Sequence, residues 1–340
     1  MTPEERKRLL SGKSKPSRSG STSRSANGRD AQAQGADGKG RNVPQQKQTL
    51  GQFAWSWVKT ILGAVAIVMV VNGLLIASFV VPTGSMENEV MTGDFVFVNK
   101  FIYGGSSPQT IPFLDIPLPF FRLPGLRDPE KGDVIVFIFP GFRNEIKAKN
   151  FEYYLKRCVA TAGDTLQVID KKVFVNGKEQ PVPPNAVFAD PAISKISNET
   201  FPPESHFTRD NWGPMRIPKE GDVIPLNDST CTSYEIFIQR EGHKLARQGE
   251  VVLIDDKPAT SYTVERDYVF GMGDNRDMSL DSRFWGFVPK ENVVGTPLIV
   301  YWSMPVAENY DADQDGRPDP MNLFKRFSNV RWNRIFNTIE

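Results

Sequence analysis

The sequence predicts a mainly β protein with a single transmembrane helix near its N-terminus. Two observations lead to this prediction. An apolar run without a charged side chain covers residues 60–81, and the chain beyond residue 82 consists of short β-branched and aromatic runs separated by Gly, Pro, Asn and Asp. No amphipathic helix is recognised in this second part, so we expect an antiparallel β-rich body.

The first 50 residues differ in composition from the rest of the chain. They are rich in Ser, Gly, Gln, Ala, Lys and Arg and lack hydrophobic periodicity, which predicts a disordered cytoplasmic tail over residues 1–52. Residues 1–59 hold 12 basic and 4 acidic side chains, whereas the remainder is net acidic. An acidic body argues against a nucleic-acid-binding protein.

Residues 53–81 are predicted to form the membrane anchor. The 22 uncharged residues from Thr60 to Val81 would span roughly 33 Å as a helix, enough for a hydrocarbon core of about 30 Å. Trp55 and Trp57 precede the run as interfacial anchors. The run is too long for a soluble core helix, and no small-x-small cleavage site follows it, so we expect an uncleaved single-pass anchor. The basic residues before it predict a cytoplasmic N-terminus and an extracytoplasmic body.

Six segments have the composition of strands: residues 95–103, 133–140, 153–161, 166–178, 251–256 and 298–304. The pair Asn176-Gly177 in the fourth segment predicts a tight hairpin turn. Residues 104–128 are Pro-rich and apolar, and we expect them either to contact the bilayer surface or to cover the core of their own domain.

The chain has only two cysteines and two histidines. Two cysteines define no disulfide framework, so Cys158 and Cys231 are expected to be free, buried thiols. With only His206 and His243 present, a mechanism that needs a histidine base or several histidine metal ligands has little support.

The segment 82–90, PTGSMENEV, directly follows the predicted anchor. Pro82 is expected to end the helix, which leaves Ser85 in a tight turn beside the bilayer. A serine in this position is a candidate nucleophile, although most serines in turns only make local hydrogen bonds. The nearby Glu87 and Glu89 are expected to face solvent.

A serine nucleophile needs a base, and a lysine serves when burial lowers its pKa toward neutrality. Lys156 lies in an apolar strand segment, where Tyr154 and Cys158 are predicted to share its face. The alternative is a surface pair of Lys156 and Arg157 on a half-exposed strand. A third segment, residues 271–289, mixes Gly, Asp, Arg and Ser with aromatic residues, which indicates either a buried, hydrogen-bonded loop or an acidic surface loop.

Together, these three segments resemble the bacterial type I signal peptidases, the leader peptidase family. The family's P-S-G-S-M motif corresponds to residues 82–86, with Thr83 in place of the first serine. Its Y-I-K-R strand motif corresponds to residues 154–157. Its G-D-N-R-D-x-S-x-D-S-R-x-W-G signature matches residues 273–286 at every fixed position.

The resemblance implies a serine endopeptidase of the bacterial cytoplasmic (inner) membrane that needs no cofactor. It would remove signal peptides from secreted preproteins, in contact with membrane lipid and the protein export machinery. Ser85 would be the nucleophile and Lys156 the general base. The Ser85 N–H and the Thr83 hydroxyl would form the oxyanion hole, and Ser279 would hydrogen-bond and orient Lys156. The other implied site residues are a supporting ion pair, Asp281 and Arg283, and the walls of a pocket for small side chains, Phe79, Val81, Met86, Val90, Tyr154 and Leu155.

The resemblance also implies a domain organisation. Residues 82–165 and 265–340 would form the catalytic β domain, and residues 166–264 an inserted, variable second β domain that carries no chemistry. The chain departs from the family in residues 88–90, where a Pro-Thr-Leu sequence is usual, and it lacks the usual Pro before Gly163. Neither departure removes a catalytic group.

Residues 311–319 contain a possible additional site. Asp311, Asp313, Asp315 and Asp319 resemble the start of a calcium loop, but Asn322 stands where an EF-hand requires a bidentate Glu. We expect a solvated acidic turn, with a calcium loop of another type as the alternative.

Two other functions remain open. A self-cleaving, repressor-type protease would share the Ser/Lys chemistry, but the membrane anchor and the absence of a DNA-binding head argue against it. An inactive, membrane-anchored binding protein on the same fold is disfavoured by the presence of both Ser85 and Lys156.

Overall fold

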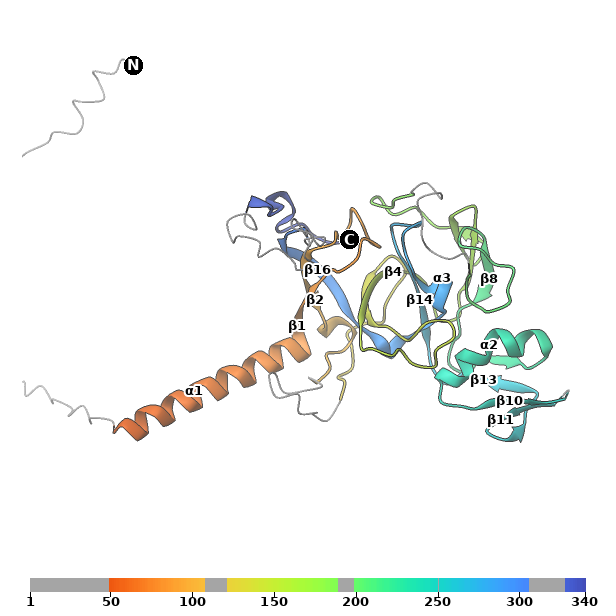
Figure 1. Cartoon of the computed structure of the whole chain (residues 1–340), viewed down its shortest axis with the longest axis horizontal. Coiled ribbons are helices and arrows are strands. Elements are labelled where there is room, and N and C mark those ends of the chain that lie inside the picture. The colour runs from red at the N-terminus through yellow and green to blue at the C-terminus, as the bar shows by residue number, and fades with distance from the viewer. Residues whose placement is uncertain (1–48, 108–120, 189–198, 250, 306–327) are drawn as a thin grey trace, which may run out of the picture. The chain divides into compact units, whose positions relative to one another are not determined.

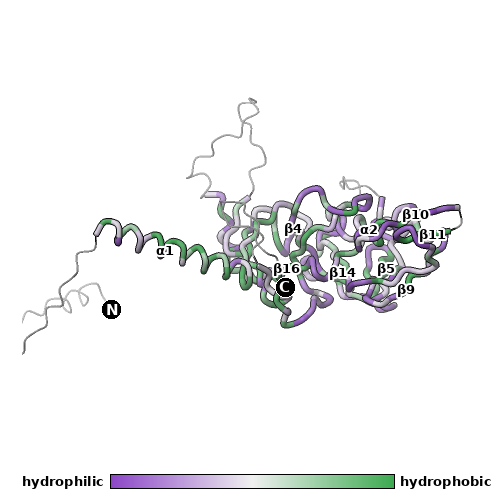
Figure 2. Tube along the Cα trace, turned by 90° about the horizontal axis from the view of Figure 1, so that it is seen from below, coloured by the Kyte–Doolittle hydropathy of each residue, from purple (hydrophilic) through white to green (hydrophobic). Residues whose placement is uncertain are grey.

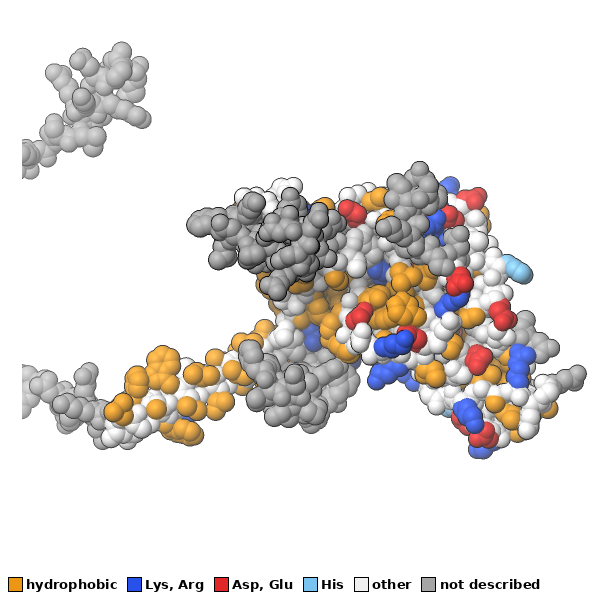
Figure 3. All heavy atoms as spheres, in the orientation of Figure 1, with side chains coloured by type: hydrophobic (Ala, Val, Ile, Leu, Met, Phe, Trp, Pro, Cys, Tyr) orange, Lys and Arg blue, Asp and Glu red, His pale blue; other side chains and the backbone are white. Residues whose placement is uncertain are grey.

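The computed structural model describes residues 49–107, 121–188, 199–249, 251–305 and 328–340. Its first element, α1 (Leu50–Val70), continues through a π-helical turn (Val71–Leu75). Residues Leu50–Leu75 contain an 18-residue stretch with a mean hydropathy of 2.1 and are, among the described residues, the one helix long and apolar enough to cross a membrane. No side chain of α1 is buried; hydrophobic residues predominate along it (Figure 2), and many of the side chains on its surface are hydrophobic (Figure 3). A helix of this length, roughly 39 Å, matches a membrane anchor.

The predicted end of the anchor at residue 81 is wrong. Residues Ile76–Val80 form strand β1, which pairs with β2 (Asp94–Asn99) from Ile76 opposite Asn99 to Val80 opposite Phe95. Pro82 therefore follows a strand and does not end a helix. Apolar composition alone cannot distinguish the last turns of a membrane helix from a β-strand. Here the pairing with β2 makes residues 76–80 a strand.

The body is built on a seven-stranded antiparallel sheet, which confirms the predicted mainly β class (Figure 1). Its strand order is β1, β2, β16 (Val293–Ser303), β3 (Val134–Ile138), β4 (Tyr153–Thr161), β14 (Tyr268–Met272) and β15 (Val288–Pro289). The long β16 pairs with β3 through its first residues and with β2 through the rest, so it joins the two halves of the sheet. Strand β4 lies between β3 and β14, with a neighbour on each side.

Residues 166–264 form smaller sheets beside this one. A four-stranded sheet has the order β7 (Lys178–Glu179), β6 (Lys172–Val175), β5 (Thr165–Ile169) and β8 (Trp212–Arg216). The turn between β6 and β7 holds Asn176 and Gly177 at φ angles of 52° and 76°, which confirms the predicted hairpin. The remaining strands are β9 (Val223–Pro225) with β13 (Ser261–Thr263), and β10 (Leu245–Gln248) with β11 (Val251–Ile254) and β12 (Lys257–Pro258).

The expectation that the body contains no amphipathic helix is wrong. Helix α2 (Asp228–Arg240) lies close to β10, β11 and β13 (Figure 1). The side chain of Asn227 accepts a hydrogen bond from Thr230 N–H (3.0 Å) and caps the helix. Cys231, Tyr234 and Ile238 recur at helical spacing and pack into the core. Many polar residues between these three positions obscured the pattern in the sequence.

Residues 166–264 share a hydrophobic core with the large sheet. One cluster of buried side chains includes Trp212 and Phe237 together with Ala160, Phe270 and Phe287 from the seven-stranded sheet and its flanking loop. Residues Ala54–Glu340 accordingly form one compact unit. This continuous core does not separate residues 166–264 from the rest of the unit. The predicted boundaries of an inserted domain therefore stay a prediction.

Cys158 and Cys231 are free and buried, as expected from the sequence. Most of the Pro-rich segment, residues 108–120, lies outside the described residues. Next to it, Phe121 and Leu123 are exposed, and Arg122 donates hydrogen bonds to the carbonyls of Gly104 and Tyr103. Contact of this segment with a bilayer stays a prediction.

His243 links Asp255 to Glu265 and should make the stability of this part of the protein depend on pH. Its Nδ1 lies 2.7 Å from Asp255 Oδ2 and its Nε2 lies 2.8 Å from Glu265 Oε1. These hydrogen bonds raise the pKa of His243 above its ordinary value. The stabilisation is therefore complete below the unfolded-state pKa, about 6.5, and is lost as the pH rises through the folded-state pKa.

We expect the melting temperature of the wild type to exceed that of His243→Gln most clearly near pH 5.5 to 6, about or below that unfolded-state pKa. The difference should shrink as the pH is raised toward about 9, well above it. Differential scanning calorimetry of both proteins across this range measures it. A difference that stays constant with pH would contradict the assignment.

Candidate active site

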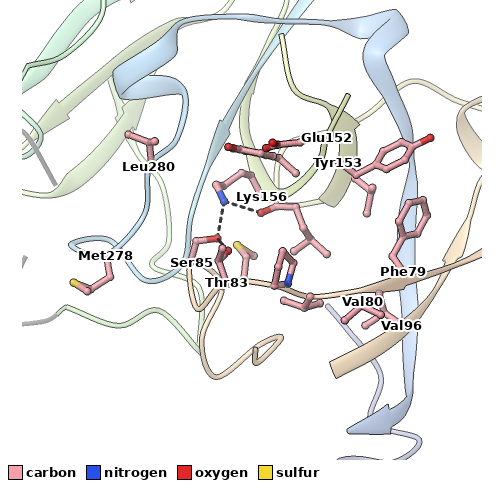
Figure 4. A pocket seen from close by; sticks show the side chains of 16 residues that line it. Phe79, Val80, Thr83, Ser85, Val96, Glu152, Tyr153, Lys156, Met278 and Leu280 are labelled. Carbon is pink, nitrogen blue, oxygen red and sulfur yellow. Dashed lines mark hydrogen bonds between the residues drawn. The ribbon is translucent and has the colours of Figure 1, made fainter. Parts of the chain in front are cut away.

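Ser85 and Lys156, which are 71 positions apart, meet in the structure. Lys156 Nζ lies 2.6 Å from Ser85 Oγ and also donates a hydrogen bond to the carbonyl of Leu155 (3.0 Å). Both residues are buried, with 8 % of Ser85 and 3 % of Lys156 exposed. Figure 4 shows the amine and the hydroxyl pointing toward each other in a pocket. A hydroxyl in direct contact with a buried amine is the arrangement that a serine nucleophile with a lysine base requires.

Ser85 belongs to the loop that connects β1 to β2. The loop closes at its base, where Val81 N–H donates to Asp94 O (2.9 Å) and Gly93 N–H donates to Val81 O (2.8 Å). Asp94 is fully buried, and its carboxylate accepts hydrogen bonds from Met91 N–H (2.8 Å) and from the Arg334 guanidinium (2.7 Å). The loop that carries Ser85 is therefore held at both ends by the sheet and its flanking chain.

Lys156 lies on β4 opposite Ile135 of β3, inside the sheet. Tyr154 and Cys158 pack into one core cluster, whereas Leu155 packs against another, as the predicted alternation of faces requires. Burial lowers the pKa of Lys156 from 10.5 to about 8, while Asp281 and Asp274 oppose this shift and Arg283 adds to it. A substantial fraction of the amine is therefore neutral near physiological pH, and the alternative of a surface Lys-Arg pair is wrong.

Ser85 and Lys156 open onto a pocket of about 760 Å³ with mostly apolar walls. Five of the six predicted wall residues line it: Phe79, Val81, Met86, Tyr154 and Leu155. Val90 does not, because it is fully buried in the cluster formed by Val81, Met86 and their neighbours. The prediction of Val90 as a wall residue is therefore wrong.

Sequence reasoning missed several wall residues: Val80, Val96, Val136, Glu152, Tyr153, Met278 and Leu280. Met278 and Leu280 flank Ser279 in the third segment, residues 271–289, and their place on either side of Ser279 could have indicated them. Val96 and Val136 lie on other strands, so only the sheet brings them to the pocket.

Thr83 lies beside Ser85. Its Oγ1 is 3.4 Å from Ser85 Oγ, and it lines the pocket. Among the described residues, the Ser85 backbone N–H donates no hydrogen bond within the protein. Thus one hydroxyl and one N–H lie next to Ser85 Oγ.

Within the third segment, residues 273–283 form a largely buried loop, as one of the two interpretations predicted. Asp281 and Arg283 form the predicted ion pair, with 2.8 Å between Arg283 Nη2 and Asp281 Oδ2. Asp281 also accepts from Gly273 N–H (3.0 Å) and caps the short helix α3 (Ser282–Trp285). Burial alone would raise the pKa of Asp281, but Arg283 and these donors hold it below its ordinary value.

Ser279 lies next to the dyad but does not bond to Lys156. Its hydroxyl is fully buried and makes no hydrogen bond of regular geometry to a described residue, but it lies close enough to Asp281 to help lower the pKa of that carboxyl. A Cβ on Gly273 would lie 2.1 Å from Ser279 Oγ and 2.6 Å from Ser85 O, so only glycine fits at this point. The role of Ser279 in orienting Lys156 stays a prediction.

Arg157, the neighbour of Lys156, points to the other face of β4 and joins all three segments. Its guanidinium donates to the Asp274 carboxylate, at 2.7 Å for Nη2 and Oδ2. Glu89 is buried, lies 3.8 Å from Arg157 and accepts a hydrogen bond from Asn185 (2.6 Å). The expectation that Glu89 faces solvent is therefore wrong, whereas Glu87 is exposed.

The described residues contain no group of three or more His, Cys, Asp or Glu side chains that could hold a metal ion. The possible calcium loop at residues 311–319 lies outside the described residues.

The buried ion pair predicts a large loss of stability in Asp281→Asn. The side chains of Arg283 and Asp281 are 2 % and 0 % exposed, so the change leaves a buried guanidinium without its counterion. We expect the free energy of unfolding to fall by about 3–5 kcal/mol. Asp222→Asn is the matched control, because its partner Arg216 is 51 % exposed, and it should cost less than about 1 kcal/mol. Urea titrations measure both, and equal losses would contradict the prediction.

Comparison with known proteins gives an independent view of this site. Residues 54–302 match the family described as "Signal peptidase, peptidase S26". Signal peptidase I of Helicobacter pylori strain J99 is 30 % identical over 306 residues, which cover 85 % of this chain and 92 % of the relative. Signal peptidase I of Rickettsia akari is 31 % identical over 288 residues, covering 81 % and 89 %. That of Aquifex aeolicus is 28 % identical over 252 residues, covering 69 % and 79 %.

The family match begins within α1 and ends in β16, so it contains the anchor, the Ser85 loop, β4 and the third segment. The relatives are matched over most of their own lengths. The chain is thus a member of the signal peptidase family, peptidase S26.

Proposed function

We propose that this chain is a membrane-anchored serine endopeptidase that removes N-terminal signal peptides from exported preproteins. The observation that carries the proposal is the 2.6 Å contact between Lys156 Nζ and Ser85 Oγ at the wall of an apolar pocket. Membership of the signal peptidase family and the apolar helix Leu50–Leu75 support the same function.

In the proposed mechanism, Ser85 is the nucleophile and Lys156 the general base. The neutral amine takes the hydroxyl proton as Oγ bonds to the scissile carbonyl carbon, and the resulting ammonium protonates the leaving amine. In deacylation, the neutral Lys156 amine takes a proton from a water molecule as the water oxygen bonds to the acyl carbon. The bond between that carbon and Ser85 Oγ then breaks, and the Lys156 ammonium returns the proton to Oγ. Burial of Lys156 supports this assignment, because it lowers the amine pKa and makes the neutral form available.

The oxyanion of the tetrahedral intermediate needs hydrogen-bond donors at a fixed place. We assign these to the Ser85 N–H and the Thr83 hydroxyl, which lie next to Ser85 Oγ. Removal of one such donor typically costs about 100- to 1000-fold in kcat.

The pocket walls would select the residues before the cut. Apolar side chains on several strands line the space beside Ser85, and they suit small apolar side chains of an extended signal peptide. The same walls exclude water from Lys156, so substrate selection and base activation share one physical cause.

The proposed location is the bacterial cytoplasmic membrane, with the N-terminus in the cytoplasm and the body outside. The basic residues before α1 support this orientation. Only ten positions separate Leu75, the last helical residue, from Ser85. This short connection favours substrates that emerge from the same membrane, where lipid and the protein export machinery would be partners.

Replacement of either member of the dyad should abolish cleavage. We expect Ser85→Ala and Lys156→Ala each to lower kcat/KM by at least about 10⁴-fold, because each removes a group that the chemical step requires. Cleavage of a purified preprotein by the full chain in detergent, followed by mass spectrometry of the new N-terminus, measures this. Near-normal turnover by either variant would sink the mechanism.

The pH dependence of kcat/KM should report the Lys156 amine. Its neutral form is the base, so the rate should rise with pH and reach half of its plateau near the Lys156 pKa of about 8. A free lysine would give a midpoint of about 10.4. The profile is to be measured with a substrate that lacks groups titrating in this range, and a midpoint near the free value would contradict a buried base.

A further inference from the structure

The loop of residues 273–283 holds the backbone on both sides of the nucleophile. Asn275 N–H donates to the carbonyl of Ser85 (3.1 Å), and Asn275 Nδ2 donates to the carbonyl of Gly84 (3.1 Å). The same loop presents Asp281, one of the carboxylates that act on the pKa of Lys156. A displacement of this loop therefore changes the surroundings of both dyad members.

The opposite side of this loop is held by residues 166–264. Asp277 is fully buried, and its carboxylate accepts hydrogen bonds from Lys171 Nζ at 2.9 and 3.1 Å. Arg209 Nε lies 3.5 Å from Asp277 Oδ1, and the Arg209 side chain is 7 % exposed. Removing a cation from a buried ion pair leaves the carboxylate uncompensated and strongly destabilises the folded protein. The contacts of Asp277 with Lys171 and Arg209 therefore favour one position of the loop.

Backbone hydrogen bonds hold the positions of Lys171 and Arg209, the two cations that contact Asp277. Lys171 lies in the tight turn between β5 and β6, with φ angles of 46° for Asp170 and 69° for Lys171. Its N–H donates to Asp210 O (3.0 Å). The carbonyl of Arg209 accepts a hydrogen bond from Arg283 Nη1 (3.0 Å), so Arg209 also reaches the buried ion pair of the loop.

Backbone hydrogen bonds connect the insertion to the loop at further points. Val187 N–H donates to Asp274 O (2.9 Å), and Arg276 N–H donates to Val187 O (2.9 Å). Phe201 N–H donates to Arg283 O (2.8 Å). Side-chain and backbone contacts thus attach the insertion to the loop from Asp274 to Arg283.

We propose that residues 166–264 position the nucleophile, and that Asp277 is the positioning residue through which Lys171 and Arg209 act. This inference rests on the proposed function. The insertion sets the place of the 273–283 loop, and the loop sets the place of Ser85 through Asn275. Since a misplacement of about 1 Å can cost roughly 100-fold in rate, a contact outside the pocket has a catalytic effect by this route.

The test uses the full chain in detergent with a purified preprotein. We expect Lys171→Met and Asp277→Asn each to lower kcat by at least about 10-fold, while KM changes by less than about threefold, because the pocket walls stay in place. The double variant should lose little more than either single variant, since both act through one contact. The midpoint of the kcat/KM pH profile should also shift, and Lys171→Arg should restore most of the rate.

Two control variants separate positioning from stability. Lys244→Met removes an exposed ion pair of the same insertion, with Asp256 at 3.2 Å, and should leave kcat unchanged. Val252→Ala removes buried methyl groups of the insertion core and should lower the melting temperature without lowering kcat per folded molecule.

The outcomes are distinguishable. A kcat that follows only the folded fraction in Lys171→Met and Asp277→Asn, as in Val252→Ala, or a pH midpoint that does not shift, would overturn the positioning role. If Ser85→Ala cleaves the preprotein at the wild-type rate, the proposed function itself is wrong, and the positioning role falls with it.

Discussion

The contact between the Lys156 amine and the Ser85 hydroxyl explains why the surrounding fold buries both side chains. An amine in water is protonated near neutral pH and cannot accept a proton, so the protein has to bury it. Strand β4, between β3 and β14, provides this burial, and the apolar pocket walls complete it. The same burial disfavours the charged amine that forms during reaction, and the buried carboxylates of Asp281 and Asp274 offset part of that cost.

Three aspartates of the third segment each bind a cation from a different part of the chain. Asp274 binds Arg157 of β4, Asp277 binds Lys171 of the insertion, and Asp281 binds Arg283 of its own loop. Buried ion pairs add little net stability compared with apolar packing, but they are costly to break. Their effect here is to favour one arrangement of the loop beside Ser85. This explains why so polar a segment lies in the interior.

Residues 166–264 pack against the large sheet and contact the loop beside Ser85. Trp212 and Phe237 of the insertion share a core with Phe270 and Phe287, so the small sheets and the large sheet are stabilised together. Sequence analysis found no chemistry in residues 166–264, and the structure places no dyad member there. Residues 166–264 do contact the 273–283 loop beside Ser85, and no local motif in the sequence indicates these contacts.

By itself, the sequence determined the mainly β class, an N-terminal apolar helix, the hairpin at Asn176-Gly177 and the candidate dyad. Each of these follows from local periodicity, from turn chemistry or from short motifs. The tertiary structure decided what depends on distant partners. Pairing with β2 makes residues 76–80 a strand, and packing removes Val90 from the pocket. Burial of Glu89 beside Arg157 and Asn185 likewise needs three separate segments. The pKa of Lys156 belongs to the same group, because desolvation is a property of the folded surroundings.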